Sequence, residues 1–176
     1  MYQIKEVGID ELEIQEWNDL LLKSEVCDPF QTYEWAEALR NSMDVEPCFL
    51  IVQSKGETMG GVMCLKKKMF EFLNSYEIEG GPLYIERNKS VVVLRSILKA
   101  FQKKKTRSAY TLFVPSPRIG YGLREIFETE GYHMLPLYTI IIDLKKPIQA
   151  IWRALKKDAR KGVRKAERSG VSVKIA

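Results

Sequence analysis

Hydrophobic residues recur along this chain at two different spacings. Apolar side chains at steps of three and four predict helices over residues 10–24, 32–42, 90–105, 123–130 and 148–170. Shorter runs that alternate apolar and polar residues, or that are rich in β-branched and aromatic residues, predict strands over 2–7, 48–53, 60–69, 74–84, 110–114, 134–144 and 171–176. Helices and strands therefore interleave along the sequence.

This order of elements predicts the fold class. Some neighbouring strands are joined by short turns and others by helices, which favours a mixed α/β sheet with helices on both faces. The compact apolar run 110–114 is expected in the centre of the sheet. Gly60 and Gly61 predict a bulge or a close approach by another backbone, and Gly80-Gly81-Pro82 predicts a bend within a strand.

Polar residues mark the expected starts of three helices. Asp10, Thr32 and Ser90 each stand at the beginning of an apolar helical pattern. A side-chain oxygen in that place can accept a hydrogen bond from a backbone N–H that the first turn leaves free. We therefore expect all three residues to cap the helices that follow them.

Positive charge is concentrated in the last predicted helix. Residues 148–170 hold eight basic and two acidic side chains, a local net charge of +6, whereas the whole chain carries +5. An unbroken helix of this length would run ~35 Å. A solvated basic face and a surface that contacts nucleic-acid phosphates are about equally good interpretations. The candidate phosphate contacts are Lys157, Arg160, Arg164, Lys165 and Arg168.

Composition narrows the class of protein. A chain of 176 residues usually forms one domain, or one domain and the beginning of another, and 45% hydrophobic residues supply ample material for a core. No apolar run approaches the ~18–20 residues that span a bilayer. The N-terminus is charged and lacks the apolar centre of a signal peptide. We expect a cytoplasmic protein without a transmembrane segment.

Thiol and metal chemistry are not expected. The three cysteines, Cys27, Cys48 and Cys64, are widely spaced, and His133 is the single histidine. This pattern excludes the common zinc motifs and argues against a disulfide framework. Cys48 and Cys64 lie in apolar runs and are interpreted as buried, inert thiols. We expect no metal site.

Three stretches are candidates for substrate binding. Gln31, Trp35 and Arg40 could form a face for a phosphorylated or sugar ligand, with a buried Trp35 as the alternative. Arg118 lies in a loop, 115–122, where backbone N–H groups before a helix could meet an anion, although a plain turn is favoured. Gly80 and Gly81 are weaker candidates. Asp143 is interpreted as a cap for the turn before Pro147. No residue is assigned as the catalytic base.

Several motifs resemble one family. FQTYEW near the start, GGPLY in the middle, and YTIIIDL followed by IWRALKKDARKGVRKAERSGVSV are together similar to the FemAB group of non-ribosomal peptidyltransferases. The last stretch is the most specific, since the family has a strand ending in Asp-Leu, a basic helix, and then Ala-x-x-x-Gly-Val-x-Val. These positions correspond here to Asp143-Leu144, Arg164-Lys165-Ala166 and Gly170-Val171-Ser172-Val173.

The resemblance implies an architecture and an activity. Family members have two tandem GNAT-like domains, so residues 1–146 would form the first domain and 147–176 a connecting basic helix and the first strand of the second. They transfer an amino acid from aminoacyl-tRNA to an amino group of a cell-wall precursor, an anionic nucleotide-sugar-peptide or polymer. No other cofactor is implied for that reaction. The basic helix would then contact tRNA, and Arg40 and Arg118 would hold the anionic acceptor.

Two alternatives remain open. Related GNAT-type enzymes acylate small amines with acyl-CoA and carry [Arg/Gln]-x-x-Gly-x-[Gly/Ala]; here Gly120 and Gly122 have that spacing, but Pro117 takes the first position. The chain could also be a non-catalytic half-protein that binds a partner or a nucleic acid. It departs from the FemAB pattern at Leu39, where the family usually has a lysine that meets a precursor phosphate, with Arg40 one place on.

Overall fold

The computed structural model describes residues 2–119 and 123–174. The chain divides into two compact units, Met1–Leu135 and Pro136–Ala176. The first unit contains the sheet and its covering helices, and the second contains two short helices. Each unit is considered by itself below.

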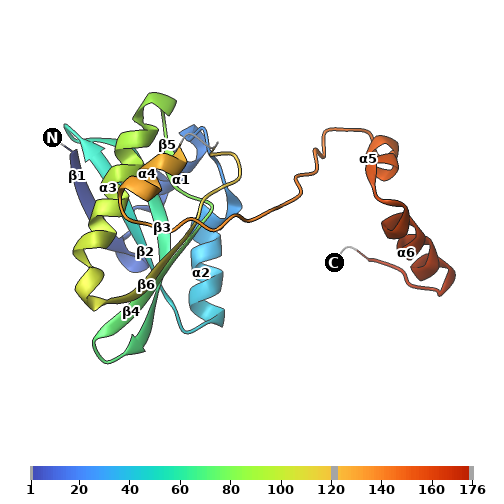
Figure 1. Ribbon diagram of the computed structural model, residues 1–176, viewed down its shortest axis with the longest axis horizontal. Helices are drawn as coiled ribbons and strands as arrows, with labels where there is room; N and C mark the ends of the chain where they lie inside the picture. Colours follow the sequence, from blue (N-terminus) through green and yellow to red (C-terminus); the bar gives the residue numbers. More distant parts are fainter. Residues whose placement is uncertain (1, 120–122, 175–176) are drawn as a thin grey trace. The chain divides into compact units, whose positions relative to one another are not determined.

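The first unit is built on a six-stranded mixed sheet (Figure 1). The strand order is β1-β2-β3-β4-β6, and the short β5 pairs with β3. Every pair is antiparallel except β4 and β6, which run parallel. The strands are β1 (Tyr2–Gly8), β2 (Glu46–Ser54), β3 (Glu57–Phe70), β4 (Leu73–Glu79), β5 (Leu83–Tyr84) and β6 (Ser108–Val114).

Helices cover both faces of this sheet, which confirms the expected fold class. Figure 1 shows α2 on one face and α3 on the other. The helices of the first unit are α1 (Ile14–Lys23), α2 (Tyr33–Ser42), α3 (Ser90–Lys103) and α4 (Arg124–Thr129). Single 3₁₀ turns occur at η1 (Ile9–Glu11), η2 (Pro29–Gln31), η3 (Arg87–Lys89) and η4 (Lys105–Arg107).

The alternation of side chains along β2 divides the apolar interior into two cores. Cys48, Leu50 and Val52 pack into the core beneath α3 and α4. Phe49 and Ile51 point to the opposite face and pack into the core beneath α1 and α2. Both sets are buried because a central strand covered on its two faces has no solvent-facing side.

Gly60 and Gly61 are sites of close approach, as expected. A β-carbon on Gly60 would lie 2.4 Å from the Leu83 carbonyl oxygen, and one on Gly61 would lie 2.7 Å from the Leu50 carbonyl oxygen. The ladder between β2 and β3 also shifts register between Val52 and Gln53, which places a bulge beside Gly60. Only glycine lets β2, β3 and β5 approach this closely.

One of the three expected helix caps is confirmed. The Thr32 hydroxyl accepts a hydrogen bond from the Trp35 backbone N–H at 3.2 Å. Asp10 instead lies within η1, and the N-cap of α1 is Glu13. Ser90 is already the first residue of α3, and its hydroxyl donates to the Arg87 carbonyl at 2.6 Å. The 3₁₀ turns η1 and η3 precede these two helices; Ser90 bonds to a residue of η3, and the Asp10 carboxylate pairs with Arg40.

Two predictions about strands are wrong: that residues 134–144 form a strand, and that residues 110–114 lie in the centre of the sheet. Residues 134–143 form neither helix nor strand, and β6 is the last strand of the sheet as described. A strand needs a neighbour for its backbone hydrogen bonds, and no strand of the described residues pairs with 134–144. Residues 171–174 also form no strand, and 175–176 lie outside the described residues.

The prediction of a single long basic helix over 148–170 is also wrong. This stretch forms two helices, α5 (Ile148–Ala154) and α6 (Lys157–Arg168). Leu155 and Lys156 are extended, with ψ of 144° and 148°. The break lets Arg160 Nη1 donate to the Arg153 carbonyl at 3.1 Å, which satisfies an end group of α5.

No helix in the described part of the chain is long and apolar enough to cross a membrane.

Candidate functional site

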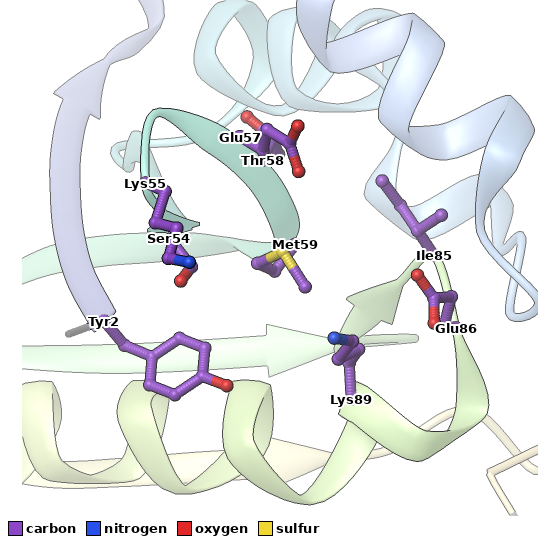
Figure 2. Close-up of a pocket in the computed structure, with 9 residues that line it drawn as sticks. All are labelled: Tyr2, Ser54, Lys55, Glu57, Thr58, Met59, Ile85, Glu86 and Lys89. Carbon is purple, nitrogen blue, oxygen red and sulfur yellow. The ribbon is translucent and has the colours of Figure 1, made fainter.

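The surface of the first unit includes two pockets, one larger and mixed in charge, one smaller and more specific in its chemistry. The larger, of about 540 Å³, lies beside the β2–β3 turn and the start of α3 (Figure 2). Two lysines and two glutamates line it, so its formal charges cancel, and it contains none of the candidate residues from the sequence. Its lining residues are Tyr2, Ser54, Lys55, Glu57, Thr58, Met59, Ile85, Glu86 and Lys89.

The smaller pocket, of about 160 Å³, has the more specific chemistry. It lies at the carboxyl ends of β4 and β6, the only parallel pair among the described strands. In open α/β sheets, ligands bind outside the carboxyl ends of parallel strands. We name it the β4–β6 pocket; its lining residues are Phe30, Trp35, Met63, Leu65, Glu77, Ile78, Glu79, Leu112 and Val114.

Aromatic side chains form one wall of the β4–β6 pocket. Phe30 in η2 and Trp35 in α2 meet edge to face, with ring centroids 5.3 Å apart. Trp35 is 37% exposed, so it is not the core residue that the alternative interpretation expected. Thr32 caps α2 between these two residues and holds their backbones in a fixed turn. The wall is therefore apolar, and the capped turn at Thr32 holds the backbones of its two aromatic residues.

Two carboxylates provide the polar groups of the β4–β6 pocket. Glu77 and Glu79 alternate on β4, so both side chains point to the same face of the sheet. The Glu77 carboxylate accepts a hydrogen bond from the Tyr110 hydroxyl at 2.6 Å. Partial desolvation raises the pKa of Glu79, and repulsion by the carboxylates of Asp28 and Glu77 raises it further. Glu79 is therefore a stronger base than an ordinary glutamate.

Gln31 lies in the core immediately behind this pocket. Its side chain is fully buried, and its amide oxygen accepts from the Met63 N–H at 2.7 Å. Its amide nitrogen donates to the Met63 carbonyl at 3.2 Å and to the Glu79 carbonyl at 2.6 Å. The Gln31 carbonyl in turn accepts from the Trp17 indole at 2.8 Å. Gln31 thus holds two backbone segments of the pocket.

Gly80 and Gly81 form the expected bend at the end of β4. Gly80 has a φ of +79°, and a β-carbon there would lie 2.5 Å from the Asp28 carboxylate. A β-carbon on Gly81 would meet Val62 at 2.6 Å and Gln31 at 3.3 Å. Gly80 also donates its N–H to the Val114 carbonyl at 2.9 Å, which joins β4 to β6 at the pocket. These glycines therefore allow the close packing behind the β4–β6 pocket.

The two candidate arginines lie apart from both pockets. Arg40 Nη1 forms an exposed ion pair with the Asp10 carboxylate at 2.7 Å. Arg118 is exposed in the loop after β6 and lines neither pocket. The glycines of that loop, Gly120 and Gly122, lie outside the described residues. Of the candidates in the first unit, Trp35 alone lines the β4–β6 pocket, with Gln31, Gly80 and Gly81 behind it.

The candidate phosphate contacts all lie on α6. None of the basic side chains between 148 and 170 forms an ion pair with another described residue. Arg164 lies over the Trp152 ring, 6.0 Å from its centroid, and Arg160 donates to the end of α5. Lys157, Lys165 and Arg168 are exposed. Despite the acidic Asp158 and Glu167, the helix therefore presents a predominantly basic surface.

The remaining sequence predictions concern turns and metals. Asp143 is a cap, as expected, because its carboxylate accepts from the Lys145 N–H at 3.0 Å. Cys48 and Cys64 are buried, while Cys27 is exposed. No cluster of three or more metal-ligating side chains occurs within residues 2–119 and 123–174.

Glu77 and Glu79 were missed at the sequence level. Their signal was the alternation Tyr76-Glu77-Ile78-Glu79 just before Gly80, which places two carboxylates on the face opposite two apolar residues. Tyr76 and Ile78 are indeed buried beneath α3. Carboxylates at the end of a strand that then bends sharply are a usable sign of a site.

Comparison with known proteins identifies the fold. No protein-family model and no curated protein sequence matches the chain. Among solved structures, FemX superposes with a TM-score of 0.60 at 17% identity, over 91% of this chain and 42% of that chain.

Two acetyltransferases are also similar. AAC(6')-Iy, in complex with the bisubstrate analogue CoA-S-monomethyl-acetylneamine, gives a TM-score of 0.55 at 11% identity, over 81% of this chain and 98% of that one. Ribosomal-protein-alanine N-acetyltransferase from Brucella melitensis gives 0.51 at 15% identity, over 82% and 100%. At such identities the likeness concerns the fold, and the chain has the GNAT-like fold.

Proposed function

We propose that this protein is an N-acyltransferase whose β4–β6 pocket binds the amine acceptor. The observation that carries the proposal is the pairing of an aromatic wall with a glutamate of raised pKa in one pocket. An ammonium group is attracted both by aromatic faces and by carboxylates. The GNAT-like fold supports the same class of reaction at the level of architecture.

The proposed reaction needs a base for the amine. Glu79 accepts a proton from the ammonium group, and the freed nitrogen attacks the carbonyl carbon of the acyl donor. Collapse of the tetrahedral intermediate breaks the ester or thioester bond and releases the tRNA hydroxyl or the CoA thiol, which takes up the second proton lost by the nitrogen. A carboxylate with a raised pKa suits this step because it is closer in basicity to the group it deprotonates. Trp35 and Phe30 orient the acceptor, and positioning supplies much of the rate enhancement.

For the donor we propose aminoacyl-tRNA, held through its phosphates by α6. The support is the concentration of exposed basic side chains on that helix and the FemAB-like motifs of the sequence. Under this proposal the acceptor amine belongs to a cell-wall precursor or a related surface polymer. The alternative donor is acyl-CoA, as bound in analogue form by the structurally similar AAC(6')-Iy.

A transfer assay with two donors tests the proposed function. The full chain is incubated with n-butylamine and either bulk tRNA charged with a mixture of labelled amino acids or labelled acetyl-CoA. We expect labelled amide from the charged tRNA only. Product from acetyl-CoA alone would show that the donor is acyl-CoA and not aminoacyl-tRNA, and the protein would still be an N-acyltransferase. No product from either donor would overturn the proposal and favour a non-catalytic half that binds a partner.

Binding of tRNA should depend steeply on salt. If α6 neutralises ~4–6 phosphates, affinity should fall at least ~100-fold between about 50 and 200 mM salt, because each contact releases a condensed counterion. Fluorescence anisotropy of labelled tRNA measures this slope. A flat salt profile would contradict the role of α6.

A charge-matched pair of variants locates the contact. Reversing three α6 charges, Arg164→Glu, Lys165→Glu and Arg168→Glu, should weaken tRNA binding at least ~10-fold at moderate salt. The control reverses three exposed lysines of the first unit with the same change in net charge: Lys67→Glu, Lys68→Glu and Lys99→Glu. Equal weakening by both variants would indicate attraction by net charge alone.

We further propose that residues 147–176 begin a second GNAT-like domain, carried by this or another polypeptide. Side chains in the preceding segment are apolar and strongly exposed, including Tyr138 at 95% and Ile140 at 85%. Burial of such side chains against a partner is favourable. The chain spans only 42% of FemX, which leaves most of that structure without a counterpart here.

A further inference from the structure

Two cysteines that the proposed reaction does not use lie in contact in the centre of the sheet. Cys48 in β2 and Cys64 in β3 are directly opposite each other in the antiparallel ladder. Their sulfur atoms are 2.8 Å apart. Both side chains are buried, at 6% and 1% exposure, among the apolar residues beneath α3. Nothing in the spacing of the cysteines along the chain indicates this contact.

The ladder shows which kind of pair they form. The backbone N–H and carbonyl of Met63 both bond to Gln31, so they point away from β2. Phe49 and Met63 are therefore a non-hydrogen-bonded pair, and the adjacent pair of Cys48 and Cys64 is a hydrogen-bonded one. The α-carbons of such a pair are ~5.5 Å apart, within the ~4.4–6.8 Å that disulfides span.

We propose that Cys48 and Cys64 form a redox-sensitive pair that closes into a reversible cross-strand disulfide when the protein meets a hydroperoxide. The contact distance and the direct opposition of the two residues carry this inference. It does not depend on the transferase activity.

The chemistry is balanced with hydrogen peroxide as the oxidant. One thiolate attacks a peroxide oxygen, which gives a sulfenic acid and, after protonation, one water. The second sulfur then attacks the sulfenic sulfur, forms the S–S bond and expels a second water. Two thiols are oxidised, one peroxide is reduced, and the chain loses two hydrogen atoms.

The surroundings make this closure slow. Burial and the hydrogen bond with Cys48 raise the pKa of the Cys64 thiol, so reactive thiolate is scarce.

Closure would act directly behind the β4–β6 pocket. Met63, the residue before Cys64, lines that pocket and is bonded through its backbone to Gln31. A covalent link between β2 and β3 therefore acts on the strand that carries this wall of the pocket and that pairs with β4 at Glu77. The thiol pair and the pocket lie on opposite faces of the same strand.

Intact mass spectrometry of the full chain in a Cys27→Ser background tests the proposal. Removing the exposed Cys27 prevents cross-linking between molecules through that residue. After treatment with hydrogen peroxide, we expect both thiols to disappear together with a mass loss of about 2 Da, and dithiothreitol to restore both. Peptide mapping should recover Cys48 and Cys64 in one cross-linked species.

Two further measurements decide the result. In Cys27→Ser/Cys48→Ala the lone Cys64 should show no loss of 2 Da. Because that variant could fold poorly, differential alkylation of the unsubstituted chain gives the same information without it: Cys48 and Cys64 should be protected to equal extents after oxidation. Unchanged thiols after prolonged oxidation, or separate sulfinic acids with a gain of about 32 Da each, would overturn the proposal.

Discussion

Replacement of Glu79 by glutamine is expected to lower the rate of amide formation by ~10²–10³-fold. Glutamine has nearly the same shape but cannot accept the proton of the acceptor ammonium group. The assay is transfer from the active donor to n-butylamine at saturating donor. The loss should appear in kcat more than in KM, because the aromatic wall that binds the acceptor is unchanged.

The pH profile provides a second readout of the same residue. Because partial desolvation and the nearby carboxylates raise the pKa of Glu79, activity should fall with decreasing pH at a higher pH than an ordinary glutamate would give. This acidic limb should be absent from the residual activity of Glu79→Gln. An unchanged limb would assign it to another group.

Loss of folding is not expected to explain the effect. A carboxyl whose pKa is raised in the folded state contributes stability that is present below its unfolded pKa and is lost as pH rises through the folded pKa. At neutral pH the ionised Glu79 therefore favours unfolding slightly, and Glu79→Gln should not lower the melting temperature there.

Glu77→Gln is the matched control for this prediction. Glu77 lies two residues away on the same face of β4, but its carboxylate is engaged by the Tyr110 hydroxyl. We expect its activity to fall by no more than about threefold. Equal losses in the two variants would show that the pocket needs negative charge and that Glu79 is not a specific base.

Replacement of Gln31 by leucine is expected to lower the free energy of unfolding by about 3–5 kcal/mol, the largest stability effect foreseen for this chain. Leucine fills a similar volume but leaves the Met63 N–H, the Met63 carbonyl and the Glu79 carbonyl without their buried partner. Urea denaturation followed by tryptophan fluorescence measures the change. The m-value should stay constant if both states keep their compactness.

Gln15→Leu gives the matched surface control. Gln15 is exposed on α1, so the same substitution there should change the free energy of unfolding by no more than about 0.5 kcal/mol. A cost below about 1 kcal/mol for Gln31→Leu would contradict the role of its amide as a backbone partner. Gln31 would then be available for the substrate contact that its sequence motif suggested.

The role of Gln31 illustrates what the sequence could not indicate. Its motif marked it as a candidate ligand residue, and it lies directly behind the candidate pocket, but with its amide turned inward. Between the pairings of β3 with β4 and with β5, the chain bends at Gly80 and Gly81, and no strand of the described residues faces Met63 on that side. The Gln31 amide bonds to the Met63 backbone where a strand would otherwise do so. Met63 lacks that strand only in the folded chain, where the segments that hold Gln31, Met63 and Glu79 come together.

Local patterns were enough for much of the first unit. The strand predicted over 48–53 and the cap at Thr32 both depend on residues close in sequence, and each formed as expected. The order of these elements was sufficient for the mixed α/β sheet with helices on both faces. Hydrophobic period and turn chemistry act over a few residues, which is why the sequence alone determined them.

Tertiary structure decided the features that depend on contacts between residues far apart in the sequence. The run 134–144 has strand composition but pairs with no strand in the part of the chain that the structure describes, so it forms no strand there. The basic stretch 148–170 has one helical pattern but forms two helices, and Arg160 of the second donates to the Arg153 carbonyl near the end of the first. The contact of Cys48 with Cys64 and the approach of Glu79 to Trp35 follow from strand register and helix packing. The spacing of apolar residues predicts which face of a helix or strand a side chain lies on. Only the pairing of strands and the packing of helices decide which residues it contacts there.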